Sequence, residues 1–89
     1  MVSFYKNNSS TNTIFNNSGG EIRLYKGSGN GGELVFEVES GYVITVINGN
    51  GVSSSSYSVT GLGTNSVSIK NTSGSTLKFD DFEITYSPE

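Results

Sequence analysis

Apolar residues recur at every second position over short stretches of this chain, and turn residues separate one stretch from the next. In ELVFEVE at 33–39, Leu34, Phe36 and Val38 share one face, while Glu33, Glu37 and Glu39 share the opposite face. A strand with one buried and one solvated face has this period of two. No segment carries the 3.6-residue period of an amphipathic helix. The pattern therefore predicts an all-β chain.

The same alternation predicts seven or eight strands joined by tight turns. We expect them at 2–6, 12–16, 21–26, 33–39, 42–48, 55–60, 66–70 and 76–86. Glycine and asparagine fill the connections at 27–32 (GSGNGG) and 48–51 (NGNG), where hairpin turns need residues that tolerate a positive φ. GSGNGG has no following helix and no Lys-Ser/Thr, so we interpret it as a turn and not as a phosphate-binding loop.

The stretch YVITVIN at 42–48 is apolar on both faces, which predicts a central strand. Tyr42, Ile44 and Val46 would lie on one face, with Val43 and Ile47 on the other. We expect a two-sheet antiparallel β-sandwich with Greek-key or jelly-roll connections. Its predicted core consists of Ile22, Leu24, Leu34, Phe36, Val38, Ile44, Val46, Tyr57, Val59, Val67, Ile69, Leu77, Phe79, Phe82 and Ile84.

Size and composition fit one small domain over residues 1–89. A chain of 89 residues can bury a single two-layer core but has little room for a deep substrate cleft. The hydrophobic fraction is only 33%, yet the aromatic and β-branched residues are placed periodically, which argues against disorder. The chain has no cysteine, so strand pairing and core burial alone must hold it together.

The composition also removes several classes of function. With no His and no Cys, the commonest general base and the thiol nucleophile are missing, and we expect no enzyme activity. A net charge of −3 gives no electrostatic basis for binding phosphates, so nucleic acid is not an expected partner.

No apolar stretch is long enough to span a bilayer, and the start MVSFYKNNSS does not resemble a signal peptide. Two interpretations of the chain stay open. It is either a complete protein without a signal peptide, or a module cut from a longer secreted parent. In both cases we expect no membrane insertion and a surface-exposed or extracellular location, the virion surface included.

Two adjacent aspartates, Asp80 and Asp81, interrupt the last strand. The step from Phe79 to Phe82 is three residues, so both rings can reach one core only if the strand absorbs an extra residue in a bulge or bend. We therefore expect a backbone irregularity there, with both rings buried.

Calcium is the alternative explanation of Asp80 and Asp81. Hard cations take carboxylate and carbonyl oxygens. The N-terminal strand, however, offers no carboxylate as a further ligand. We therefore expect a protein that needs no cofactor and is stable without metal.

Arg23 and Tyr25 alternate with Ile22 and Leu24, so a guanidinium and a phenol ring project from one outer face. Aromatic rings stack on the apolar face of a sugar, while charged groups take its hydroxyls. With Asn30 in the neighbouring loop, these residues form the predicted ligand site. An ordinary surface pair is the alternative interpretation.

Longer patterns resemble a type of β-sandwich module common in secreted bacterial proteins. They are GGEIRLY, SGYVITVI and the closing pair VSIKNTSG and FEITY, all within residues 19 to 87. The likeness is to jelly-roll and immunoglobulin-like accessory domains, which are often glycan-binding, and it implies a carbohydrate-binding-module-like protein. In related jelly rolls an aspartate on the last strand often holds a structural calcium. A weaker likeness, at LYKGSGNGGELVFEV, is to the βγ-crystallin motif, although Asn30 replaces its aromatic residue.

The leading functional prediction is therefore a non-catalytic, surface-exposed binding module for glycans. The alternative is a structural subunit, such as a phage capsid decoration protein or a component of a surface appendage. Its expected partner would be another protein surface, and a homo-oligomer is compatible with both.

Overall fold

A computed structural model describes residues 1–11, 14–16 and 21–89, and these residues form strands joined by turns. A single 3-10 turn, η1 (Ser54–Ser56), is the only helical element among them. Positions 12–13 of the second predicted strand lie outside the described residues. The strands are β1 (Val2–Tyr5), β2 (Ile14–Asn16), β3 (Glu21–Leu24), β4 (Glu33–Glu37), β5 (Tyr42–Asn50), β6 (Tyr57–Thr60), β7 (Ser66–Asn71), β8 (Leu77–Phe79) and β9 (Asp81–Pro88).

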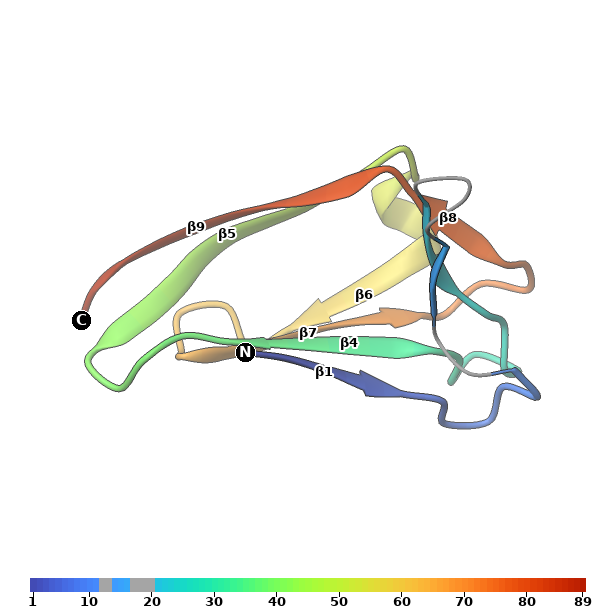
Figure 1. The fold of residues 1–89 in the computed structure, drawn as a ribbon, viewed down its shortest axis with the longest axis horizontal. Coiled ribbons are helices and arrows are strands. Elements are labelled where there is room, and N and C mark those ends of the chain that lie inside the picture. Colours follow the sequence, from blue (N-terminus) through green and yellow to red (C-terminus); the bar gives the residue numbers. More distant parts are fainter. Residues whose placement is uncertain (12–13, 17–20) are drawn as a thin grey trace.

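The described strands belong to three antiparallel sheets. The first has the order β1-β4-β7-β6, the second has the order β2-β3-β8, and β5 pairs with β9. Figure 1 shows the four-stranded sheet along the base, the β5–β9 pair above it, and the β2-β3-β8 sheet across one end. We call this the closed end. The opposite end, with the β4–β5 connection and the last residues of β9, is the open end.

The all-β antiparallel class is confirmed, and the predicted sandwich topology stays a prediction. The expected single strand at 76–86 is wrong, because the chain forms β8 and β9 there, in two different sheets. A two-residue period indicates extended backbone. It does not show which strands pair with each half of the segment.

The apolar core lies between the sheets. Its members are Leu24, Leu34, Ile44, Ile47, Val67, Ile69, Leu77 and Phe79. Every residue of the predicted core except Val46 either belongs to this cluster or packs against it, half-buried. The alternation of the sequence therefore identified the inward faces of β3, β4, β6, β7, β8 and β9.

Strand β5 departs from the prediction because of a bulge. Ile44 pairs with Tyr86 and Val46 pairs with Thr85, so Thr45 is an extra residue in the ladder. Beyond the bulge the side chains change face, so Ile47 is buried while Val46 is 44% exposed. The prediction of a central strand is wrong, because among the described strands β5 pairs with β9 alone. The bulge explains why Ile47 is buried, although it lies on the opposite nominal face from Ile44.

Asp80 marks the place where the chain passes from one sheet to another. β8 ends at Phe79 and β9 begins at Asp81, with a bend at Asp80 between them. Phe79 is fully buried and Phe82 is half-buried, with their ring centroids 4.6 Å apart. The predicted backbone irregularity is confirmed, although Phe82 is less buried than expected.

Asn71 ties the four-stranded sheet to the closed end. Its side chain is fully buried, and its Nδ2 donates hydrogen bonds to the carbonyl oxygens of Leu24 and Ser75, each at 2.8 Å. Its Oδ1 accepts from the backbone N–H and the hydroxyl of Ser73, at 2.8 and 2.7 Å. One amide group therefore joins β7, β3 and the loop before β8.

The described residues include no helix that is long and apolar enough to cross a membrane.

Candidate functional site

A row of inward-facing residues runs along the β5–β9 pair and continues past the core. Gly49 opposes Phe82 and Ile47 opposes Ile84, both over the core. The row then reaches the pair formed by Ile44 and Tyr86, with Tyr42 opposite Pro88 beyond it. At this open end the tyrosine rings extend beyond the packed core: Tyr42 is 36% exposed and Tyr86 is 57% exposed.

These two rings line an open cleft of about 670 Å³. Their centroids are 6.0 Å apart and the ring planes meet at 75°, an edge-to-face arrangement that aromatic pairs favour. The other lining residues among those described are Met1, Glu37, Val38 and Glu39. We call this site the tyrosine cleft.

The second wall of the tyrosine cleft follows from the end of β4. Glu37 is the last residue of this strand, and hydrogen bonds of 2.9 Å in each direction join its backbone to that of Met1. Glu39 lies two residues further on and accepts a backbone hydrogen bond from Tyr42 at 3.1 Å. Both glutamates are exposed. The cleft therefore combines two aromatic faces with two carboxylates.

The predicted pair Arg23 and Tyr25 lies at the closed end. Arg23 Nε donates to Glu21 Oε2 at 3.0 Å, and both of these side chains are about seven-tenths buried. Its hydrogen bond with Tyr25, and secondly that with Glu21, raise the pKa of the Arg23 guanidinium. The structure thus brings Arg23 and Tyr25 together, but the guanidinium already has local partners.

Asn30 lies in the turn that follows β3. Its backbone N–H donates to Gly27 at 3.1 Å, and its carbonyl accepts from Asn8 at 3.0 Å. The turn is joined to Tyr25 through the N–H of Gly32, at 2.8 Å. Within the described residues, the hydrogen bonds of Asn30 are made by its backbone and none reaches Arg23 or Tyr25. A ligand role for Arg23, Tyr25 and Asn30 stays a prediction.

The carboxylates of Asp80 and Asp81 have different surroundings. Asp80 packs beside Gly51, and its N–H donates to the Asn50 carbonyl at 2.9 Å. Asp81 accepts a short hydrogen bond from the Asn50 amide, which also donates to Glu83 at 3.0 Å. No group of three or more acidic, His or Cys side chains in the described part of the chain is arranged to hold a metal ion. Metal binding by Asp80 and Asp81 stays a prediction.

Sequence reasoning missed the tyrosine cleft. Its signal was present, because Tyr42 and Tyr86 are the outermost aromatics of two inward-facing rows. The alternation placed each ring on its correct face. It could not reveal that the opposing sheet stops covering this face before the rows end.

Comparison with known proteins gives no match. No family model, no curated protein and no solved structure matches this chain. The functional argument therefore rests on the chemistry of the two sites.

Proposed function

We propose that this protein is a non-catalytic module that binds a glycan in the tyrosine cleft. The observation that carries the proposal is the pair of partly exposed rings, Tyr42 and Tyr86, on the wall of an open cleft that also holds Glu37 and Glu39. The proposal keeps the glycan chemistry expected from the sequence and moves its centre to the open end.

The cleft offers the two kinds of contact that sugars require. Tyrosine rings give flat apolar area with little rotamer freedom to lose, and they suit the C–H face of a pyranose. Carboxylates accept hydrogen bonds from sugar hydroxyls, and these charge-assisted bonds are stronger than neutral ones. A few polar groups beside aromatic surface are typical of small-ligand sites.

The tyrosine cleft is the better candidate than the Arg23–Tyr25 face for one reason. Arg23 already forms a hydrogen-bonded ion pair with Glu21, so a ligand would have to replace this contact. Glu37 and Glu39, by contrast, form no ion pair or side-chain hydrogen bond with another described residue. A ligand hydroxyl would therefore reach them without breaking a bond of the protein.

We further propose that the module works on an extracellular or otherwise surface-exposed protein, and that its sheets form a sandwich of the jelly-roll or immunoglobulin-like kind. Support comes from the resemblance of residues 19 to 87 to such accessory domains, and from the core that lies between antiparallel sheets.

A glycan array with wild-type protein and two matched variants tests the function and its location. Tyr86→Ala removes a ring of the cleft, and Tyr25→Ala removes a ring at the closed end. We expect the wild type to bind, Tyr86→Ala to lose about tenfold or more in affinity, and Tyr25→Ala to keep its affinity. The reverse ranking would move the site to the Arg23–Tyr25 face. A wild type that binds no glycan would refute the proposed function.

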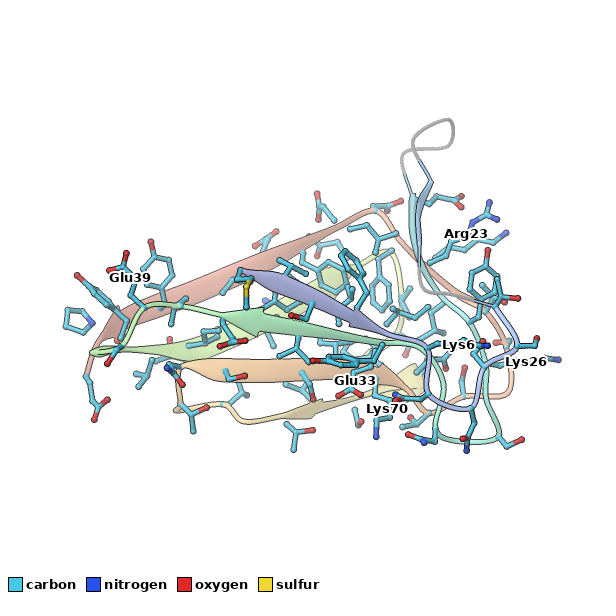
Figure 2. All side chains as sticks on the ribbon, turned by 60° about the horizontal axis from the view of Figure 1, so that its bottom comes forward. Lys6, Arg23, Lys26, Glu33, Glu39 and Lys70 are labelled. Atoms are coloured by element: carbon cyan, nitrogen blue, oxygen red, sulfur yellow. The ribbon has the colours of Figure 1, made fainter. Side chains whose placement is uncertain are left out.

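A second candidate function, the structural subunit, is favoured by the distribution of charge. Glu37, Glu39 and Glu89 gather at the open end, where Glu89 donates to Gly41 at 2.8 Å. The four basic residues labelled in Figure 2 lie at the other end: Lys6, Arg23, Lys26 and Lys70. End-to-end contact between copies would bring opposite charges together. Sedimentation at low and high salt tests it, because salt-sensitive oligomers support this candidate and a monomer at both salt concentrations contradicts it.

A further inference from the structure

Among the described residues of the tyrosine cleft, no cationic side chain lies beside the carboxylates. Among the described lining residues, Glu37 and Glu39 carry negative charge and none is a lysine or an arginine. Met1 also lines the cleft, and its N-terminal ammonium donates to the Glu37 backbone carbonyl at 2.9 Å. The described lining residues therefore carry one positive and two negative charges.

The basic side chains of the protein are far from this cleft. The sequence contains five, and Figure 2 shows four of them at the end opposite Glu39. The fifth, Lys78, pairs across the strands with Arg23 in the closed-end sheet. Because surface charge is screened over about 10 Å in ordinary buffer, these groups do little to neutralise the potential in the cleft.

The two tyrosine rings favour the same sign of ligand charge. The face of an aromatic ring is negative, and a cation placed over it gains roughly 0.5–1 kcal/mol at an exposed site. Both rings line the same cleft as the two glutamates, so a ligand in the cleft can reach a ring face and a carboxylate together. An uncharged sugar would use only the stacking surface and hydroxyl contacts.

We propose that the tyrosine cleft selects amino sugars that carry a free ammonium group over their N-acetylated, uncharged counterparts. This inference rests on the proposed glycan-binding function. The sugar ring would lie against Tyr86 and Tyr42, and the ammonium would bond Glu37 or Glu39. The ligand class is thus an oligosaccharide of 2-amino-2-deoxyhexose units.

Calorimetric titration with two oligosaccharides of equal length tests the selection. One is an oligomer of glucosamine and the other is the corresponding oligomer of N-acetylglucosamine. We expect the wild type to bind the glucosamine oligomer at least about tenfold more tightly, and added salt to reduce this ratio. In Glu37→Gln combined with Glu39→Gln the ratio should fall towards one. Glu83→Gln, at the other end of β9, should keep the wild-type ratio.

The outcomes separate the two proposals. If the wild type binds both oligomers equally, or if the double variant keeps the full preference, the selection for an ammonium is wrong and glycan binding stands. If Tyr86→Ala binds as tightly as the wild type, the ammonium is not held in this cleft. If neither these oligomers nor an array of neutral and acidic glycans binds, the proposed function itself fails.

Discussion

The closed and open ends of the molecule are held together in different ways. At the closed end, the buried amide of Asn71 joins three segments, and the ring of Phe79 packs against Phe82 and Tyr57, with centroids 4.6 and 5.5 Å away. At the open end, Tyr42 and Tyr86 contact each other but stay partly exposed.

This difference indicates that the closed end mainly stabilises the fold, while the open end has surface available for a ligand. A side chain that is fully buried and fully hydrogen-bonded contributes to stability and has no surface to offer a ligand. A ring that extends beyond the core contributes less to stability and keeps its face available. We therefore expect substitutions at the closed end to change folding, and substitutions at the open end to change binding.

The largest effect should come from Asn71→Ala. It removes four hydrogen bonds and leaves the carbonyl of the buried Leu24 without its side-chain donor, so the free energy of unfolding should fall by about 3 kcal/mol. Chemical denaturation measures it. Asn48→Ala, at an exposed position of β5, is the matched control and should stay within about 0.5 kcal/mol of wild type. Equal losses of unfolding free energy in Asn71→Ala and Asn48→Ala would show that the hydrogen bonds of Asn71 do not hold the closed end together.

A somewhat smaller loss is expected for Gly49→Ala. A Cβ at this position would lie 2.6 Å from Cδ1 of the buried Phe79 ring, and such overpacking costs about 1–3 kcal/mol. Gly74 has open space around it and no positive φ, so Gly74→Ala should be nearly neutral. Thermal unfolding of both variants checks this. A Gly49→Ala protein as stable as wild type would show that the Phe79 ring can shift to accept the added methyl group.

Tyr86→Ala should have a small effect on folding. The ring is 57% exposed, and loss of its edge-to-face contact with Tyr42 costs about 1 kcal/mol or less. Chemical denaturation measures this change in unfolding free energy, which is then compared with the affinity loss expected for the same variant. A loss as large as that of Asn71→Ala would mean that the open end also supports the fold, and the contrast between the ends would disappear.

The smallest effect should come from metal removal. Asp81 already has the Asn50 amide as its partner, and Asp80 lies against Gly51, so we expect EDTA to leave the melting temperature unchanged. A drop of about ten degrees would instead identify these aspartates as calcium ligands. Such a drop is larger than the shift that a loss of about 1 kcal/mol causes in a domain of this size. Repeating the melt with added calcium is the control.

The bend at Asp80 was predictable because its cause is local. Phe79 and Phe82 are three positions apart, and two rings at that spacing reach one core only through an irregular backbone. The core members of β4 and β7 were predictable for a similar reason, since alternation within one strand fixes which side chains share a face.

The bulge at Thr45 could not be read in the same way. The stretch YVITVIN is apolar on both nominal faces, which fits a central strand as well as a bulge, and only its pairing with β9 shows that Thr45 is an extra residue. A register is a property of two strands, so neither segment alone shows where a shift of one residue exchanges the faces. Val46 and Ile47 were assigned to the wrong faces for this reason.

The sequence by itself determined the all-β class, the positions of most strands, and the inward faces of their side chains, because these follow from a period of two and from local turn chemistry. Only the tertiary structure decided how the strands divide among three sheets and where those sheets stop covering each other. Tyr42 and Tyr86 are far apart in the chain, and nothing local brings them together. Their cleft exists because strand pairing places β5 beside β9, and because the core ends before the two strands do.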